Sequence, residues 1–214
     1  PTIAAGLLHD TAEDGLVSFD DLKEAFGDEI SGLVDGVTKI SKMHFSTRKE
    51  RQAENFRKMI IAMAKDIRVI LIKFADRLHN MQTLRFLSPE KQVQIAQETF
   101  DIYAPLANRM GIFWLKIELE DLCLEYLKPE VFARLKEQIT KKQDEHKRYI
   151  EEVKGILEDV LKKHHIKGEV SGRLKHLYSI YRKMEAQNLE FDQVYDTIAF
   201  RVIVESVREC YETL

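Results

Sequence analysis

The chain has 214 residues, a net charge of −3, and 44% hydrophobic beside 32% charged residues. This composition is ordinary for a soluble globular protein, and the nearly balanced charge favours neither nucleic acid nor a membrane surface as a partner. No apolar stretch approaches the roughly 18–20 residues that span a bilayer, and no signal peptide opens the sequence, so we expect a cytoplasmic protein. The two cysteines, Cys123 and Cys210, fit a reducing compartment and are not expected to form a disulfide.

The first residues already lie inside an apolar periodic segment, and neither an initiator Met nor a polar cap precedes it. The last residues, 210–214, have helical character. We therefore expect a fragment of a longer protein, cut at both ends. The sequence does not indicate an oligomeric state.

Residues 1–126 are predicted to be helical almost throughout. Apolar residues recur at helical spacing in five segments, residues 28–39, 53–63, 66–84, 89–104 and 117–126. Residues 67–72 have the composition of a strand, but the apolar spacing continues to Met81 and favours a buried helix. Residues 41–52 are polar, basic and without a period, which predicts a loop or a mobile segment.

Polar and proline residues mark several helix starts. Ser18 and Asp21 form a capping pattern, and the helix they begin is predicted to end at Gly27. Ser88 followed by Pro89 predicts another helix start, because proline suits the first helical position. Pro105 is predicted to introduce the next helix.

The second half of the chain changes character twice. Dense charge and a narrow apolar stripe over residues 130–165 predict a connecting helix or helical hairpin, with a single surface helix of the first domain as the alternative. After Gly168, a helix over 175–184 and a period-2 strand over 198–204 predict the opening β-α-β of an α/β domain. We therefore expect three parts, a mainly helical domain over 1–128, a helical connector over 129–167 and the start of an α/β domain over 168–214.

Two short motifs carry the chemistry. One is Leu-Leu-His-Asp with a following Glu-Asp in residues 7–14, and the other is Phe-Ala-Asp-Arg-Leu-His-Asn-Met in residues 74–81. Each places polar groups at the end of an apolar helical run. A His–Asp pair, His9 and Asp10, together with the distant Asp76 can hold one divalent metal ion and leave positions open for water and phosphate oxygen.

Helical spacing adds further groups to this candidate centre. Glu13 and Asp14 lie one turn beyond the His–Asp pair, where one carboxylate could orient or deprotonate a water and the other could support it. Asn80 shares a helix face with Asp76, and a neutral amide suits ribose or base recognition beside phosphates. Taken singly, each group could be a chance dipeptide or a solvated helix end. Their joint placement after two buried helices favours a metal site.

These motifs resemble those of the HD phosphohydrolases of the Rel/Spo family, the enzymes that make and degrade guanosine tetra- and pentaphosphate in the bacterial stringent response. The similarity continues through three further segments, residues 53–59, 66–71 and 102–111. The resemblance implies attack of water at the 3′-diphosphate of ppGpp or pppGpp, with release of pyrophosphate and GDP or GTP. It implies a mainly α-helical HD fold for the first domain.

The resemblance also implies roles for the singled-out residues. His9, Asp10 and Asp76 would be Mn²⁺ ligands, and Glu13 and Asp14 would be the catalytic acidic pair. The ligand types by themselves also allow iron, zinc or magnesium.

Two further points follow from the same resemblance. Asn80 would contact the nucleotide. The family's metal site uses another His from an earlier helix, which this chain does not contain, so three of the four expected protein ligands are present. We therefore expect a parent protein that is competent as a hydrolase, while the chain by itself need not be.

A second resemblance lies in the basic segment 162–184, which could otherwise be a solvated basic helix. Residues 171–184 are similar to the family's ATP-binding synthetase motif, in which Gly172 would let the backbone approach a phosphate. The implied polyphosphate-binding residues are Arg173, Lys175 and Lys183. Residues 195–204 resemble the strand that carries the catalytic Mg²⁺ ligand, here Asp196. With only the opening of a synthetase present, we do not expect the chain to transfer pyrophosphate from ATP to GDP or GTP.

Two other functions stay open on the sequence. A generic HD nucleotidase is one, but it would have no need of the synthetase-like residues 171–204. A degenerate HD module that regulates an active synthetase is the other, and the intact acidic residues of both motifs argue against it.

Overall fold

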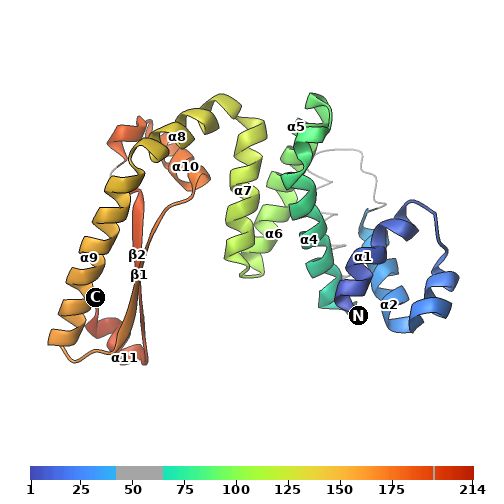
Figure 1. Cartoon of the computed structure of the whole chain (residues 1–214), viewed down its shortest axis with the longest axis horizontal. Helices are drawn as coiled ribbons and strands as arrows, with labels where there is room; N and C mark the ends of the chain where they lie inside the picture. Colours follow the sequence, from blue (N-terminus) through green and yellow to red (C-terminus); the bar gives the residue numbers. More distant parts are fainter. Residues whose placement is uncertain (42–64, 195) are drawn as a thin grey trace. The chain divides into compact units, whose positions relative to one another are not determined.

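The structure is a computed structural model that describes residues 1–41, 65–194 and 196–214. The described chain divides into two compact units, residues 1–127 and 128–214 (Figure 1). Apart from Ser41, the predicted loop over 41–52 lies outside the described residues, and so does the predicted helix over 53–63.

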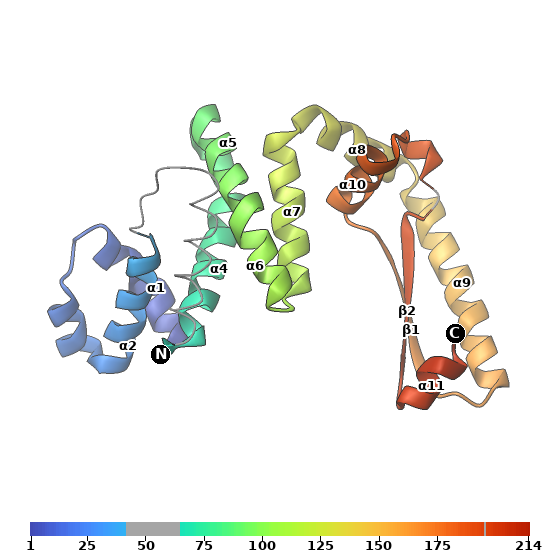
Figure 2. The ribbon, with the colours of Figure 1, turned by 180° about the vertical axis from the view of Figure 1, so that it is seen from behind.

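All the regular secondary structure that is described in the first unit is helical, as the sequence predicts. Its α-helices are α1 (Thr2–Glu13), α2 (Phe19–Ser41), α4 (Ile67–Gln82), α5 (Pro89–Glu98), α6 (Ala104–Arg109) and α7 (Phe113–Leu127). A 3-10 turn (Leu84–Phe86) follows α4, and a π-helical turn (Thr99–Tyr103) separates α5 from α6. Helix α1 contacts both α2 and α4, and α4 also contacts α7 (Figure 2).

Local signals fix the ends of these helices. The Ser18 hydroxyl and backbone N–H both donate to Asp21, whose own N–H donates to Ser18 Oγ at 3.1 Å, so the predicted capping box is confirmed. Gly27, with φ of 84°, breaks the helical geometry within α2 at the predicted end. Helix α5 begins at Pro89 as predicted, but the Ser88 side chain makes no capping hydrogen bond.

Helix α4 settles the ambiguous segment 67–72 in favour of the buried helix. Asp66 lies at its N-cap and accepts a hydrogen bond from the Arg68 N–H at 2.9 Å. Its apolar side chains enter one core with those of α1, α2 and α7, and the most buried are Ile70 and Met81, both 0% exposed. Because the apolar residues continue at helical spacing beyond residue 72, a helix buries more of them than a short strand would.

Helix α2 approaches α4 closely at Gly36. A Cβ added at Gly36 would lie 2.8 Å from Cγ2 of the buried, β-branched Val69, which has little freedom to move away. We therefore expect Gly36→Ala to destabilise the first unit by about 1–3 kcal/mol through overpacking. Gly32, on the same helix with open space around it, is the matched control, and Gly32→Ala should instead stabilise by about 0.5–1 kcal/mol. Urea unfolding followed by circular dichroism compares the two variants, and equal stability would contradict the close approach.

The second unit joins helices to a two-stranded antiparallel sheet. Its elements are α8 (Pro129–Lys141), α9 (Gln143–Lys163), β1 (Gly168–Leu174), α10 (Leu177–Gln187), a 3-10 turn (Phe191–Gln193), β2 (Ile198–Val204) and α11 (Val207–Glu212). The predicted strand over 198–204 and the order β-α-β are confirmed. The strands pair from Gly168 opposite Val204 to Leu174 opposite Ile198.

The charged segment 130–165 forms two helices, α8 and α9, that belong to the second unit. Helix α9 packs against β1, and Figure 1 shows it as a long helix beside the sheet. Helix α8 contacts α10. The alternative of a single surface helix of the first domain is therefore wrong. The narrow apolar stripe of α9 is explained by its contact with the strands.

Two single-residue predictions are also answered. Cys123 is buried and Cys210 is exposed, and both are free thiols, as expected. Burial raises the pKa of the Cys123 thiol to about 12, and its Sγ donates to the Ala96 carbonyl oxygen at 3.2 Å. Among the described helices, none combines the length and the apolar character needed to cross a bilayer.

Candidate active site

The predicted metal ligands come together where the end of α1 faces the middle of α4. His9 Nε2 lies 2.9 Å from Asp10 Oδ1 and 3.7 Å from Asp76 Oδ1. The His9 and Asp76 side chains are 9% and 11% exposed, whereas that of Asp10 is 71% exposed. Two largely buried groups from distant helices therefore meet one exposed carboxylate, which leaves the centre open on one side.

The orientation of His9 is set by its own helix. Its Nδ1 lies 2.8 Å from the Gly6 carbonyl oxygen, which can only accept, so Nδ1 carries the proton. The ring then points its other nitrogen, Nε2, toward the two carboxylates. This nitrogen is buried and has no hydrogen-bond partner. A backbone carbonyl that fixes the tautomer in this way is a common support for a metal-binding histidine.

Both oxygens of Asp76 are held. Lys73 Nζ donates to Oδ2 at 2.7 Å, and Asn80 Nδ2 donates to Oδ1 at 2.8 Å. Burial alone would raise the pKa of this carboxyl, but the hydrogen bond and charge of Lys73, with smaller contributions from His9 and Arg77, hold the pKa below its usual value. Asp76 is therefore a fixed carboxylate rather than a freely rotating one.

The acidic pair follows at the end of α1, as helical spacing predicts. Glu13 is the last residue of the helix, and Asp14 forms its C-cap, with an N–H that donates to the Asp10 carbonyl oxygen at 2.9 Å. Glu13 is half-buried, and its Oε2 is buried without a hydrogen-bond partner. Asp14 is exposed. The two carboxylates thus differ in environment, and Glu13 is the one with an unsatisfied oxygen inside the protein.

The donor chemistry fits a divalent cation. A buried imidazole nitrogen that makes no hydrogen bond faces two carboxylate oxygens, and one divalent cation would suit all three donor atoms. In the parts of the chain that the structure describes, however, no group of three or more His, Cys, Asp and Glu side chains is arranged to enclose a metal ion. His9, Asp10 and Asp76 therefore fit as members of a ligand set rather than as a complete one.

Helix α4 is held in place by Arg77, the residue next to Asp76. Its guanidinium donates to Glu98 Oε2 at 3.1 Å and to the Tyr103 hydroxyl at 3.0 Å, and lies 4.1 Å from the centre of the Tyr103 ring. Burial lowers the pKa of Arg77, but Tyr103 and Glu98 outweigh it and hold the pKa above its usual value. These contacts tie α4 to the π-helical turn, a local geometry that often occurs beside functional sites.

Sequence reasoning did not single out Lys73 and Arg77. Both are charged residues inside an apolar helical pattern, and both are buried, at 6% and 9% exposure. A lysine three residues before a candidate metal ligand shares its helix face, which is the signal that could have identified Lys73. Nothing in the local sequence indicates the partners of Arg77, since they lie on other elements.

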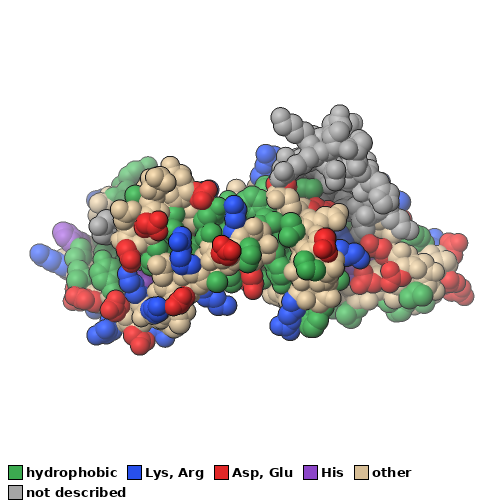
Figure 3. Space-filling model, turned by 90° about the horizontal axis from the view of Figure 1, so that it is seen from above, with side chains coloured by type: hydrophobic (Ala, Val, Ile, Leu, Met, Phe, Trp, Pro, Cys, Tyr) green, Lys and Arg blue, Asp and Glu red, His purple; other side chains and the backbone are tan. Residues whose placement is uncertain are grey.

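Exposed acidic side chains are frequent on α1 and α2. In Figure 3 they are frequent at the end of the first unit that α1 and α2 form. The exposed members on these two helices and the turn between them are Asp10, Asp14, Asp20, Asp21, Glu24, Asp28 and Glu29. Of these residues, only Asp10 and Asp14 belong to the candidate centre.

The second predicted centre lies in the other unit. Asp196 Oδ2 accepts from Lys175 Nζ at 2.8 Å, and Oδ1 accepts from Lys183 Nζ. The hydrogen bonds from Lys175 and Lys183 lower the pKa of Asp196 to about 2. Arg173 is exposed on β1, and no described contact joins it to Asp196. Three of the four predicted residues are therefore adjacent, with both carboxylate oxygens capped by ammonium groups.

The structure gives Gly172 a packing role that the sequence did not indicate. A Cβ at this position would lie 2.7 Å from Ile150 Cγ2 of α9 and 2.8 Å from Phe200 Cε1 of β2. The missing side chain therefore lets a helix and a neighbouring strand pack against β1. Close packing is thus one reason for a glycine at this position, and the approach to phosphate stays a prediction.

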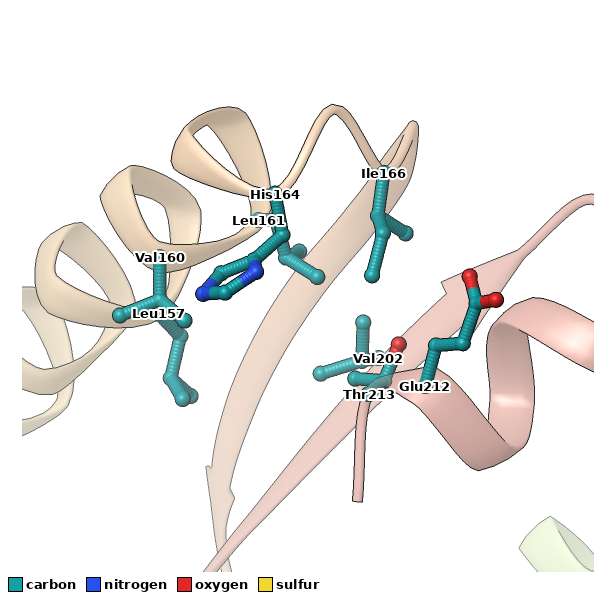
Figure 4. A pocket seen from close by; sticks show the side chains of 8 residues that line it. All are labelled: Leu157, Val160, Leu161, His164, Ile166, Val202, Glu212 and Thr213. Atoms are coloured by element: carbon teal, nitrogen blue, oxygen red, sulfur yellow. The ribbon is translucent and has the colours of Figure 1, made fainter.

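Two cavities lie outside the predicted centres. One, of about 380 Å³, is lined mainly by apolar residues of α4 and the start of α7, including the exposed Trp114. The other, of about 120 Å³, lies between α9, β2 and α11 (Figure 4). His164 and Glu212 are its only titratable lining groups, and Figure 4 shows them on opposite sides of it. Neither cavity contains a predicted site residue.

The family comparisons agree with this architecture. A family model described as "HD domain" matches residues 1–113. A second, described as "Region found in RelA / SpoT proteins", matches residues 172–214. The first unit is thus an HD domain, and its His–Asp pair lies at the centre described above.

Known relatives match the chain over its whole length. It is 56% identical over 216 residues to a "GTP pyrophosphokinase" of Myxococcus xanthus, covering 100% of this chain and 28% of the relative. It is 52% identical over 213 residues to a "Probable guanosine-3′,5′-bis(diphosphate) 3′-pyrophosphohydrolase" of a Synechocystis strain, with 99% and 28% covered. The "Bifunctional (p)ppGpp synthase/hydrolase SpoT" of Escherichia coli K12 is 47% identical over 213 residues, with 100% and 30% covered. The chain therefore belongs to the RelA/SpoT family of HD-domain proteins and spans less than a third of the length of these relatives.

Proposed function

We propose that the chain carries the hydrolase centre of a metal-dependent enzyme that hydrolyses the 3′-diphosphate of ppGpp and pppGpp. Water attacks the phosphorus that is bonded to the 3′-oxygen, and the bond between that phosphorus and the 3′-oxygen breaks. The products are pyrophosphate and GDP (from ppGpp) or GTP (from pppGpp). The observation that carries this proposal is the buried Nε2 of His9, which makes no hydrogen bond and faces the carboxylates of Asp10 and Asp76. The printed names of the Synechocystis and Escherichia coli relatives support it.

The residues have distinct roles in this proposal. His9, Asp10 and Asp76 would hold the ion, for which we propose Mn²⁺, and Asn80 would contact the nucleotide in addition to its bond with Asp76. When bound, such an ion supplies Lewis acidity to water and positive charge to the diphosphate. Glu13 is the proposed base, because its unsatisfied Oε2 is free to accept the proton of the attacking water.

Asp14 completes the acidic pair. It is exposed at the C-cap of α1, so it is placed to exchange protons with solvent after the reaction. We therefore propose that the half-buried Glu13 removes the proton from water and that the exposed Asp14 passes it to solvent.

The second unit contains the residues of a second proposed centre, for pyrophosphate transfer. We propose residues 1–128 as the hydrolase domain, 129–167 as a helical connector that packs within the second unit, and 168–214 as the opening of a synthetase domain. In the synthetase, Asp196 would hold Mg²⁺, and Arg173, Lys175 and Lys183 would bind the polyphosphate of ATP for transfer to GDP or GTP. Magnesium sites commonly combine one or two carboxylates with substrate phosphates, which suits a lone Asp196 beside lysines.

The alternatives are not favoured. A generic nucleotidase does not explain a match to RelA and SpoT proteins over residues 172–214. A degenerate regulatory module would not need an unpaired histidine nitrogen beside two carboxylates, since burying such a group costs free energy.

The test is release of pyrophosphate from ppGpp by the natural full-length protein, with Mn²⁺ and after removal of divalent ions by chelation. We expect release with Mn²⁺, none after chelation, and recovery when Mn²⁺ is added back. Absence of release under all three conditions would overturn the hydrolase and leave the HD domain as a non-catalytic module.

A further inference from the structure

We propose that Lys73 is a positioning residue that makes Asp76 bind the metal ion through one oxygen only. The inference rests on the proposed function and concerns how the ligand is presented. Lys73 Nζ holds Oδ2 of Asp76 at 2.7 Å, which leaves Oδ1 as the oxygen nearest to His9 Nε2. Oδ1 also accepts from Asn80 at 2.8 Å and retains room for a second partner, since a carboxylate oxygen accepts more than one.

The burial of Lys73 makes this contact durable. Its side chain is 8% exposed, so breaking the pair with Asp76 would leave a buried ammonium without a counter-charge, which is costly. Lys39 is the contrast, because its bond to Asp35 is also within one helix turn but its side chain is 70% exposed. An exposed pair of that kind is easily broken. Lys73 is thus a fixed part of the centre rather than a surface charge.

Single-oxygen binding has a chemical consequence. A carboxylate that binds through both oxygens occupies two coordination positions, and Ca²⁺, which takes six to eight oxygen ligands, readily accepts such a mode. Ions that prefer six ligands are served better by one oxygen, with positions left for water and phosphate. Lys73 should therefore favour Mn²⁺ over Ca²⁺ and keep the centre open to substrate.

The experiment compares Lys73→Met, Lys73→Arg and the control Lys39→Met in the natural full-length protein. Calorimetric titration with Mn²⁺ alone and with Ca²⁺ alone gives both affinities without substrate. Loss of a group that orients a ligand typically weakens metal binding about 10- to 100-fold, so we expect that loss for Mn²⁺ in Lys73→Met. We expect a smaller loss for Ca²⁺, so that the preference for Mn²⁺ falls. Lys73→Arg should restore most of the preference, and Lys39→Met should change neither affinity.

Three outcomes would count against the inference. An unchanged Mn²⁺ to Ca²⁺ preference in Lys73→Met would overturn it, and so would an arginine variant that behaves like the methionine variant, because size rather than charge would then matter. If Lys73→Met does not fold, a crystal structure of the unmodified protein with Mn²⁺ decides, since Asp76 bound through both oxygens overturns the proposal. Failure of the unmodified protein to bind Mn²⁺ would instead remove the proposed metal site itself.

Discussion

Replacing Asp10 with alanine is expected to abolish both Mn²⁺ binding and release of pyrophosphate from ppGpp by the natural full-length protein. Asp10 Oδ1 is the carboxylate oxygen nearest to His9 Nε2, at 2.9 Å, and Asp76 is already held by two other groups. Changes to groups that merely orient metal ligands cost about 10- to 100-fold, so loss of a ligand should exceed about 100-fold. Calorimetry with Mn²⁺ and a pyrophosphate assay measure the two effects.

The matched control for this variant is Asp28→Ala. The Asp28 side chain is 81% exposed, comparable with 71% for Asp10, but it pairs with Lys23 on α2. It should leave metal binding and turnover unchanged. If Asp10→Ala retained more than about a tenth of the Mn²⁺ affinity, the loss would be no larger than that of an orienting group, and Asp10 would not be a ligand.

Replacing Glu13 with glutamine should separate catalysis from metal binding. Glutamine keeps the shape of the side chain but cannot accept a proton from the attacking water. Loss of a positioned general base costs typically about 10²–10⁴-fold in rate, so turnover should fall by that factor. The Mn²⁺ affinity should change little, because Glu13 is assigned to the proton and not to the metal ion. Single-turnover rates at saturating Mn²⁺ and ppGpp give the comparison.

Two results would contradict this assignment. If Glu13→Gln lost metal binding in parallel with turnover, Glu13 would be a ligand. If Glu13→Gln kept full turnover, the base would lie elsewhere, with Asp14 as the first residue to replace. Glu24→Gln, a change of the same kind at an exposed position of α2, controls for the loss of one negative charge.

Part of the site is local and could be predicted from the sequence. Helical spacing places the acidic pair one turn beyond His9 and Asp10, and the structure has both carboxylates at that end of α1. The bond between His9 and Gly6 is also local, because three residues separate them along one helix. The strand β2 follows from its alternating pattern. These features depend on neighbours within a few residues, which is the range that periodicity and capping residues report.

The remaining features required contacts between distant segments. The sequence by itself determined the helices of the first unit, the strand at 198–204 and the residue types of both centres. Only the tertiary structure decided that α1 meets α4, that Lys73 and Arg77 are buried there, and that α8 and α9 belong to the second unit. The physical reason is that a periodic pattern shows which face of an element is apolar but not which other element covers it. The partner of a buried charge is therefore fixed only once the neighbouring element has packed against that face.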